Sequence, residues 1–400
     1  MLPTSLQMQP QQYYWLRLNQ IPGLGPVRLK QLWQRFGTAE AILNAPSQCL
    51  AELGMRRSII DALMGSAVPA SSTSSALSIT TIEAIDLWLI DPQHHLLTLE
   101  DPGYPEALRQ IADPPPLLYL LGDAELLNLP QIALVGSRNA TAQGLENSYA
   151  YSRYLSAHGL IPTSGLALGI DAAAHAGGLD GLGLTVAVLG TGVDRVYPAR
   201  HQRLAQQIVE QGGVLVSELG LGTPPMAQNF PKRNRIISAL SLGVVVVEAA
   251  LKSGSLITAR QALEQGREVF ALPGSIHNPL SKGCHSLIRQ GALLVDSAAQ
   301  VLQELAPQLA CFDVSGLPAA TGVRVIGATN ERSEANDQAL LRLSTTEKKL
   351  LQATGYETTS LDRLVLRSGL SIAQVQTELL SLELDGWVTA VAGGYQRSAR

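Results

Sequence analysis

Cysteine is scarce in this chain of 400 residues, and the three cysteines, Cys49, Cys284 and Cys311, are far apart. An odd number of widely spaced cysteines argues against a disulfide framework and is typical of a reducing compartment. No apolar run reaches the ~18 residues that a membrane-spanning helix needs. The opening residues lack the charged and apolar segments of a secretory signal. We therefore expect a soluble, cytoplasmic protein without a membrane span.

Charge is also limited, because only 16% of the residues are charged and the formal net charge is -4. This balance gives no global sign of nucleic-acid binding, so any such function must depend on local patches. Residues 131–300 contain 13 Lys/Arg and 10 Asp/Glu, a net charge of +3 within an acidic chain. The positive charge is therefore concentrated in the middle of the chain. The length of the whole chain predicts more than one domain.

Residues 1–90 are expected to form a small helical domain, of helix-hairpin-helix or SAM-like type, that ends in a polar linker. The stretch IPGLG at 21–25 predicts a tight turn, and apolar residues recur at helical spacing from Leu29 to Phe36. A hairpin of this kind can hold a DNA phosphate on its Gly-rich turn. An ordinary helical packing module explains the same pattern, and both interpretations stay open.

Seven apolar runs alternate with helical stretches between residues 131 and 295. Most runs are continuous rather than alternating, which is typical of strands buried on both faces. The pattern predicts an α/β domain over residues 91–305, with an extended, Rossmann-like parallel sheet. Two more strands, joined by a Pro-rich connection, are expected between residues 94 and 123.

The last part of the chain predicts a linker over residues 306–340 and a winged helix over residues 341–400. The winged helix is indicated by a helix pair with a Gly turn, followed by a hairpin through Gly393 and Gly394. Its presumed recognition helix has no Lys or Arg and carries Glu378 and Glu383. We therefore expect this unit to contact protein rather than a DNA groove.

Glycine, small hydroxyl residues and cations follow the apolar runs of the central domain. Ligands of doubly wound sheets bind beyond the carboxyl ends of the strands. Glycine lets a ligand approach the backbone, and the helices that follow add unsatisfied N–H donors. These loops predict an anion-binding rim. Its members are Gly136, Ser137, Arg138, Ser164, Gly165, Ala167, Gly169, Lys252, Ser253, Gly254 and Ser255.

Cations crowd the start of a helix predicted over residues 229–240, where the helix dipole already places positive charge. Asn229 is expected as its N-cap and Pro231 as its first helical residue. A bound anion would offset the repulsion, so this helix is expected to face the rim, with Arg138 and Arg235 both directed to solvent. The helix would contribute Phe230, Lys232, Arg233, Asn234 and Arg235.

Phe230 stands beside this basic cluster, where it could stack on an unpaired base or belong to the core. The chain has no P-loop motif, and GTGVDR lacks the third glycine of a dinucleotide site. Several loops along one sheet edge fit a polymer of phosphates better than one nucleotide. Two alternatives are a nucleotide hydrolase, with Glu218 or Glu248 as general acid or base, and a purely structural scaffold.

The motifs ALVGSRNATAQG, SGLALGIDAAAHAGGL, AVLGTGVDRVYP and NFPKRNRIISALSLGVVVVEAALKSGSLITA resemble the DprA/Smf family of DNA-processing proteins. The resemblance implies an extended Rossmann-like fold that binds single-stranded DNA and forms a homodimer through this domain. It also implies a role in natural transformation, in which the family protects incoming strands and loads the recombinase RecA. No nucleotide hydrolysis is implied, so the chain is expected not to be an enzyme and to need no cofactor.

The resemblance also assigns roles to residues. Arg138 would hold a phosphate, and the Gly165–Gly169 loop would offer backbone donors. Asp171 and His175 would orient that loop. Cys284 and His285 are adjacent but lack the spacing of a metal site, so no metal is expected. The path of the strand would be lined by Phe230, Lys232, Arg233, Arg235 and Lys252.

Overall fold

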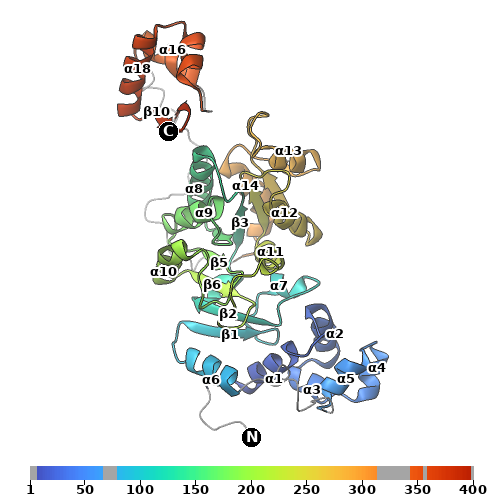
Figure 1. The fold of residues 1–400 in the computed structure, drawn as a ribbon. Helices are drawn as coiled ribbons and strands as arrows, with labels where there is room; N and C mark the ends of the chain where they lie inside the picture. The colour runs from blue at the N-terminus through green and yellow to red at the C-terminus, as the bar shows by residue number, and fades with distance from the viewer. Residues whose placement is uncertain (1–6, 66–78, 313–342, 355–357, 398–400) are drawn as a thin grey trace. The chain divides into compact units, whose positions relative to one another are not determined.

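The computed structural model describes residues 7–65, 79–312, 343–354 and 358–397. The chain divides into two compact units, Met1–Thr321 and Gly322–Arg400 (Figure 1). Most of the linker predicted over residues 306–340 lies outside the described residues, as does the polar stretch before the central domain. The first residues of the predicted linker are helical, because helix α14 runs from Ala298 to Leu309.

The first unit opens with helices, as predicted; up to Trp88 the described residues contain six. Gly23 has a φ of 82° in the turn between the first two, and Gly54 has a φ of 71° in a second helical hairpin. Both values lie in the left-handed region that glycine adopts without strain. The helices are α1 (Pro10–Asn19), α2 (Pro26–Phe36), α3 (Ala39–Leu43), α4 (Ser47–Glu52), α5 (Arg57–Leu63) and α6 (Ile79–Trp88).

The helical region shares a core with the adjacent sheet edge. Gln12 Nε2 donates to the Leu96 carbonyl at 2.7 Å. Trp15, which is fully buried, donates from Nε1 to Glu100 Oε1 at 2.9 Å. The two interpretations of the Gly23 turn, a phosphate-binding hairpin and an ordinary helical packing module, both stay open.

The described residues form one nine-stranded sheet in the order β1-β2-β6-β5-β4-β3-β7-β8-β9. All seven apolar runs of the central domain become parallel strands, which confirms the prediction. The two earlier strands pair antiparallel and extend the edge at β6. The strands are β1 (His94–Thr98), β2 (Leu117–Gly122), β3 (Gln131–Val135), β4 (Ile161–Ser164), β5 (Val186–Val188), β6 (Val214–Ser217), β7 (Gly243–Val246), β8 (Glu268–Ala271) and β9 (Leu293–Leu294).

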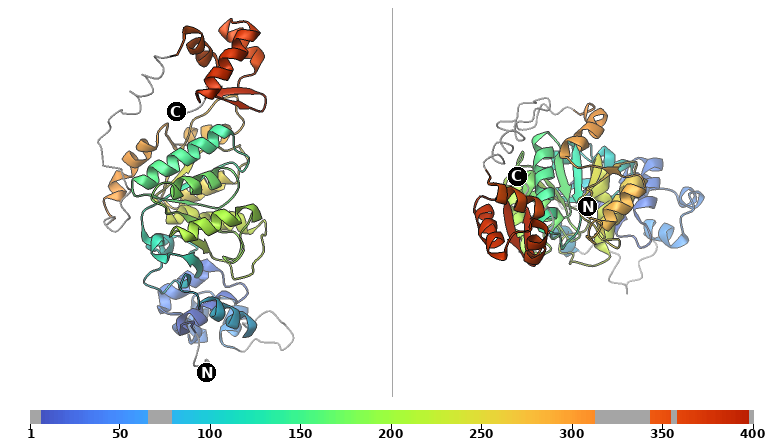
Figure 2. Two further views of the ribbon diagram at one scale, coloured as in Figure 1. Left: turned by 90° about the vertical axis from the view of Figure 1, so that its left-hand side faces the viewer. Right: turned by 90° about the horizontal axis from the view of Figure 1, so that it is seen from above.

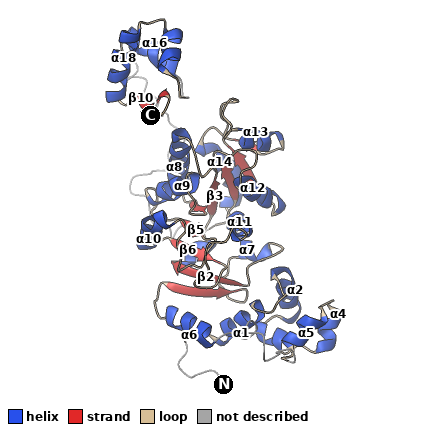
Figure 3. Ribbon diagram, in the orientation of Figure 1, coloured by secondary structure: helices blue, strands red, loops and turns tan. Residues whose placement is uncertain are grey.

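Helices cover both faces of the parallel strands, which is why the strand sequences are continuously apolar (Figures 1 and 3). One face carries α8 (Ala142–Ala157), α9 (Ile170–Leu179), α10 (Gln202–Glu210) and α14, and Figure 2 shows the first three side by side. The other face carries α11 (Asn229–Leu240), α12 (Ser255–Glu264) and α13 (Lys282–Arg289). The short α7 (Glu106–Gln110) packs on α11. The fold is therefore the doubly wound α/β type that the sequence predicts.

The strand order reverses at β3, which lies between β4 and β7. From β3 the chain builds β4, β5 and β6 in one direction, and α11 then carries it back to β7 on the other side. The loops after β3 and β7 therefore diverge to opposite faces of the sheet, which leaves a crevice at the carboxyl ends of these strands. Doubly wound folds bind their ligands in this crevice, so we expect the ligand site of this protein there.

The second unit is a winged helix, as predicted. It comprises α16 (Thr345–Thr354), α17 (Leu361–Ser368), α18 (Ile372–Leu384), β10 (Val388–Val391) and β11 (Gly394–Arg397). The two strands pair antiparallel through a turn that includes Gly393. Leucine, valine and tryptophan side chains form a separate core. None of the described helices in either unit is both long and apolar enough to span a bilayer.

Candidate functional site

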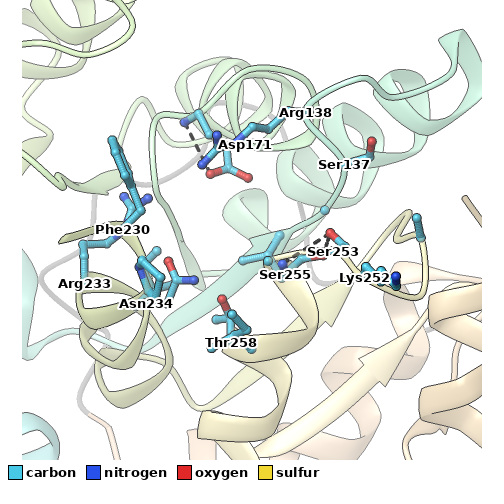
Figure 4. A pocket seen from close by; sticks show the side chains of 18 of the residues that line it. Ser137, Arg138, Asp171, Phe230, Arg233, Asn234, Lys252, Ser253, Ser255 and Thr258 are labelled. Carbon is cyan, nitrogen blue, oxygen red and sulfur yellow. Dashed lines mark hydrogen bonds between the residues drawn. The ribbon is translucent and has the colours of Figure 1, made fainter. Parts of the chain in front are cut away.

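A pocket of about 760 Å³ occupies the crevice at the strand-order reversal (Figure 4). Its walls come from the connections that follow the five strands β3 to β7 and from the helices α11 and α12. The structure thus brings loops that are more than 100 residues apart in sequence to one edge of the sheet, as predicted. The predicted residues that line it are Gly136, Ser137, Arg138, Ala167, Phe230, Arg233, Asn234, Lys252, Ser253, Gly254 and Ser255.

An aromatic and cationic cluster forms one side of the pocket. Arg138 is exposed, and its guanidinium carbon lies 5.6 Å from the centroid of the Phe230 ring. Phe230 is half-buried, because one part of its ring packs so closely on Gly190 that a Cβ there would lie 2.8 Å from it. Phe230 is therefore not a core residue, and part of its ring remains open to the pocket.

Tyr197 extends this cluster, although the sequence analysis did not predict it as a site residue. Its ring centroid lies 5.6 Å from that of Phe230, with the planes tilted by 47°. The side chain is 47% exposed, which is unusual for a large aromatic residue. An aromatic residue in a loop after a strand, here in the stretch VYP after β5, could have indicated a site residue. Only the fold brings that connection next to the start of α11.

Lys252 lies across the pocket from Phe230 in Figure 4 and is exposed. It belongs to the loop that joins β7 to α12. The hydroxyl oxygens of Ser253 and Ser255 are 2.7 Å apart, which ties this loop to the first turn of the helix. A Cβ on Gly254 would meet no atom within 4 Å, so packing does not require glycine there. The loop presents a cation and free space to a ligand.

Arg233 lines the pocket as part of its buried wall, with only 4% of its surface exposed. Its Nη1 donates to the carbonyls of Gly165, at 2.7 Å, and Val188. Burial lowers the pKa of Arg233 to about 10, and the charge of Asp171 partly offsets this effect. The guanidinium fills the space where a Gly165 side chain would stand. Arg233 therefore joins the loop after β4 to β5 and is not freely exposed to a ligand.

In the loop from Gly165 to Gly169, the amides of Gly165, Leu166 and Ala167 bond within the protein, so these three donors are not free for a ligand as predicted. The Gly165 and Ala167 amides donate to Asp171 Oδ2 at 3.1 and 3.4 Å. Burial raises the pKa of Asp171, while Arg233 and these amides act in the opposite direction. Gly169 has a φ of 74° and passes so close to the Ser137 carbonyl that no side chain fits. Asp171 thus orients the loop, as expected.

His175 orients the same loop through a hydrogen bond to its backbone. The Leu166 amide donates to its Nε2 at 3.3 Å, and its Nδ1 lies 2.8 Å from Thr185 Oγ1. The Thr185 hydroxyl donates to the Pro162 carbonyl, so its oxygen must accept the hydrogen bond from His175. Nδ1 of His175 therefore carries the hydrogen. Burial lowers the pKa of His175 to about 3, which keeps the ring neutral. The expected structural role is confirmed.

Ser164, Gly165, Gly169, Lys232 and Arg235 are predicted site residues that do not line the pocket. Ser164 is fully buried and donates to the Leu134 carbonyl at 2.6 Å. Gly165 and Gly169 shape the loop behind the lining, and Lys232 is exposed on α11.

Arg235 faces away from the pocket and is only 7% exposed. It forms ion pairs with Glu218 at 2.7 Å and with Asp113 at 2.9 Å. Opposite charge outweighs burial, so its pKa is raised. The expectation that Arg138 and Arg235 share a solvent-facing rim is therefore wrong. Successive helical residues point in different directions, and Arg235 projects to the other side of α11.

The start of α11 also differs from the prediction. Gln228 occupies the N-cap position, so Asn229 is the first helical residue and Pro231 the third. The first turn then contains Lys232 as its cation, whereas Arg233 and Arg235 belong to the second turn. The repulsion from the helix dipole is smaller than the sequence indicated, because it falls off within the first turn.

Residues 95–306 match the family described as DNA recombination-mediator protein A, which covers more than half of the chain and contains every residue that lines the pocket. The chain belongs to the DprA/Smf family. Residues 334–394 also match the DprA winged helix domain. The resemblance seen in the sequence motifs is thereby confirmed, and the family places the chain in DNA processing.

Relatives of the DprA/Smf family cover most of the chain. Protein Smf of Escherichia coli (strain K12) is 41% identical over 374 residues, which are 92% of this chain and 96% of that protein. DNA processing protein DprA of Streptococcus pneumoniae is 47% identical over 204 residues, 51% of this chain and 72% of that protein. The X-ray structure of DprA from Streptococcus pneumoniae matches with a TM-score of 0.60 and 36% identity, covering 74% of this chain and 99% of that one.

The carboxylates that a hydrolase on this DprA/Smf fold could use are held by other groups. Glu248 accepts hydrogen bonds from the amide and the hydroxyl of Thr141, at 2.9 and 2.6 Å. Glu218 is paired with Arg235. Neither glutamate is among the residues described as lining the pocket, where Asp171 is the acidic member.

Proposed function

We propose that the chain binds single-stranded DNA in the pocket and along the carboxyl edge of the sheet. The observation that carries this proposal is the convergence of loops after β3, β4 and β7 on one pocket with two exposed cations, Arg138 and Lys252. Phosphates of a flexible strand gain charge-assisted hydrogen bonds from both. A single strand has the freedom to follow such a bent, recessed path.

Phe230 and Tyr197 favour a single strand over a duplex. The half-buried Phe230 ring and the exposed Tyr197 ring each offer a surface on which an unpaired base can stack. Every base has an aromatic face that can stack in this way. The Arg138 guanidinium already lies over the Phe230 ring, so a phosphate bound by Arg138 would bring its own base near the aromatic pair. The arrangement thus supports binding without a strong sequence preference.

Binding without hydrolysis is the accompanying proposal. Glu218 forms an ion pair and Glu248 accepts hydrogen bonds within the protein. One carboxylate oxygen of Asp171, which lines the pocket, accepts hydrogen bonds from two backbone amides. From the family resemblance, we further propose that the chain acts in the cytoplasm as a homodimer through the sheet domain. There it would protect the bound strand and load RecA recombinase during natural transformation and recombination.

A titration of labelled oligo-dT at rising salt tests the binding proposal. The logarithm of the affinity should fall with the logarithm of salt by about 0.7 per phosphate contact. The double variant Arg138→Ala/Lys252→Ala should therefore have a slope that is shallower by about 1.4, with an unchanged unfolding transition. Arg289→Ala is the matched control, since Arg289 is exposed on the last turn of α13, which precedes the amino end of β9.

A wild-type affinity that does not change with salt would contradict the proposal, as would equal effects of the double variant and the control. Incubation with nucleoside monophosphates tests the hydrolase alternative. Released base that disappears in Glu248→Gln, while Gln143→Ala in the first turn of α8 retains it, would replace the binding proposal by an enzymatic one.

A further inference from the structure

The outward face of α18 in the winged helix carries an apolar stripe. Leu380 and Leu384 are 60% and 80% exposed, and Ala373 and Thr377 are exposed on the same face. These four residues, here called the α18 stripe, follow one another at intervals of four, three and four. That spacing places them in one row and is the spacing at which two helices pack as a coiled coil.

The stripe points away from the core of its own unit. Val375, Leu379 and Leu382 are buried in that core, on the opposite side of the helix. The Thr377 hydroxyl donates to the Ala373 carbonyl at 2.9 Å, so its hydrogen-bonding group is satisfied within the helix and its methyl group can contact a partner. All four positions are therefore suited to apolar packing.

DNA is a poor occupant for this face, although recognition helices of winged helices enter the major groove through it. Helix α18 contains no Lys or Arg between Ile372 and Leu384. Glu378, Glu383 and Asp385 instead bring negative charge close to where phosphates would lie. The same absence of cations leaves no barrier to packing against another apolar helix.

We propose that the α18 stripe binds the α18 stripe of a second copy of this chain, with the two helices antiparallel. In that register Leu384 of each copy lies opposite Ala373 of the other, and Leu380 opposite Thr377. Each large side chain meets a small one, so the row is complementary to itself in size. A parallel arrangement would instead place leucine against leucine and alanine against alanine.

Charge favours the same orientation. In the antiparallel pair, Glu383 and Asp385 at the end of one helix approach the first turn of the other, where the helix dipole is positive. Parallel helices would bring the two copies of these carboxylates side by side at the same end, where they repel. Size and charge thus select one occupant and one orientation.

Disulfide cross-linking of the full-length chain tests this proposal. In a background with Cys49→Ser and Cys311→Ser, which leaves the buried Cys284, the variants Ala373→Cys and Leu384→Cys are oxidised mildly, separately and as a mixture. Residues that face each other across a helix pair can close a disulfide, whereas the two Ala373 positions of an antiparallel pair are about 16 Å apart along the axis. The mixture should form at least tenfold more covalent dimer than either variant alone.

Leu380→Glu in both chains of the mixture should lower the cross-linking at least tenfold, because it buries a charge in the row. Leu366→Glu is the matched control, since Leu366 is 84% exposed on the neighbouring helix α17 and lies outside the stripe; it should change little. The proposal is overturned by no mixed dimer, by equal cross-linking of Ala373→Cys with itself, or by an equal loss in the control. The first of these outcomes would exclude a second copy of this chain as the occupant of the stripe.

Discussion

Helix α11 and the loops that face it contain the same kind of side chain in very different surroundings. Arg233 and Arg235 are 4% and 7% exposed, and their guanidinium groups are held by carbonyls and carboxylates of the protein. Arg138 and Lys252, on the loops after β3 and β7, are exposed at the mouth of the pocket. The comparison shows that one set of cations builds the site, whereas the other is available to a ligand. The two sets should respond to substitution in opposite ways.

Replacing Arg233 should have the largest effect on stability. Arg233→Ala removes the donors of two buried carbonyls and the positive charge near buried Asp171, so the free energy of unfolding should fall by about 3–5 kcal/mol. Urea unfolding measures this loss. Arg138→Ala is the control from the other set and should stay within about 0.5 kcal/mol of wild type. Equal stabilities of the two variants would show that Arg233 is not part of the framework.

Replacing Arg235 should cost less stability, because one of its partners can still reach water. Arg235→Ala leaves Glu218, whose side chain is 14% exposed, without its partner, while the Asp113 side chain is 42% exposed. We expect a loss of about 2–3 kcal/mol in the free energy of unfolding. The affinity for oligo-dT of the protein that remains folded should not change. A tenfold loss of affinity without a change in stability would restore Arg235 to the binding surface.

Acid should weaken the framework beneath the pocket through His175. The folded pKa is about 3 and the ordinary value is 6.5, so the unfolded chain binds more protons between these values. Stability due to this neutral ring is complete above pH 6.5 and is lost as the pH falls, by about 2 kcal/mol between pH 7 and pH 5. His175→Gln keeps one donor and one acceptor without a titrating group. Its urea midpoint should depend less on pH than that of wild type; identical pH profiles would exclude His175 as the source.

Replacing Phe230 should affect binding rather than stability, and its effect should be the smallest. Phe230→Leu still fills the space above Gly190 but removes the aromatic face, so affinity for oligo-dT should fall by about 1 kcal/mol, or roughly fivefold, at the low end of base stacking. Phe230→Tyr retains the ring and is the control. Stacking is contradicted if both variants bind alike.

The strands and the helix start show how far the sequence alone could go. Continuous apolar runs such as QIALV predicted buried parallel strands, because a strand covered on both faces has no solvent-facing position that needs a polar residue. Glycines before helices predicted the loops of the pocket. The direction of each side chain along α11 could not be predicted from the sequence, since a shift of one residue in the helix start turns every side chain by about 100°.

The missed contacts have a physical cause as well. Tyr197 and Phe230 are 33 positions apart in the sequence, and no local pattern records that their rings meet. The internal use of the Gly165 and Ala167 amides was hidden too, because Asp171 reaches them only once the loop after β4 has closed. Backbone donors read from a Gly-rich sequence are free for a ligand only if no side chain of the fold satisfies them first.

The order of apolar and polar residues by itself determined the parallel sheet, the helical start of the chain, the winged helix and the edge of the sheet at which the pocket lies. These features follow from local periodicity and from the burial that it requires. The tertiary structure alone decided which cations face solvent and which support the pocket. A charge takes its role from the partners and the water around it, and those are set by contacts between segments far apart in the chain.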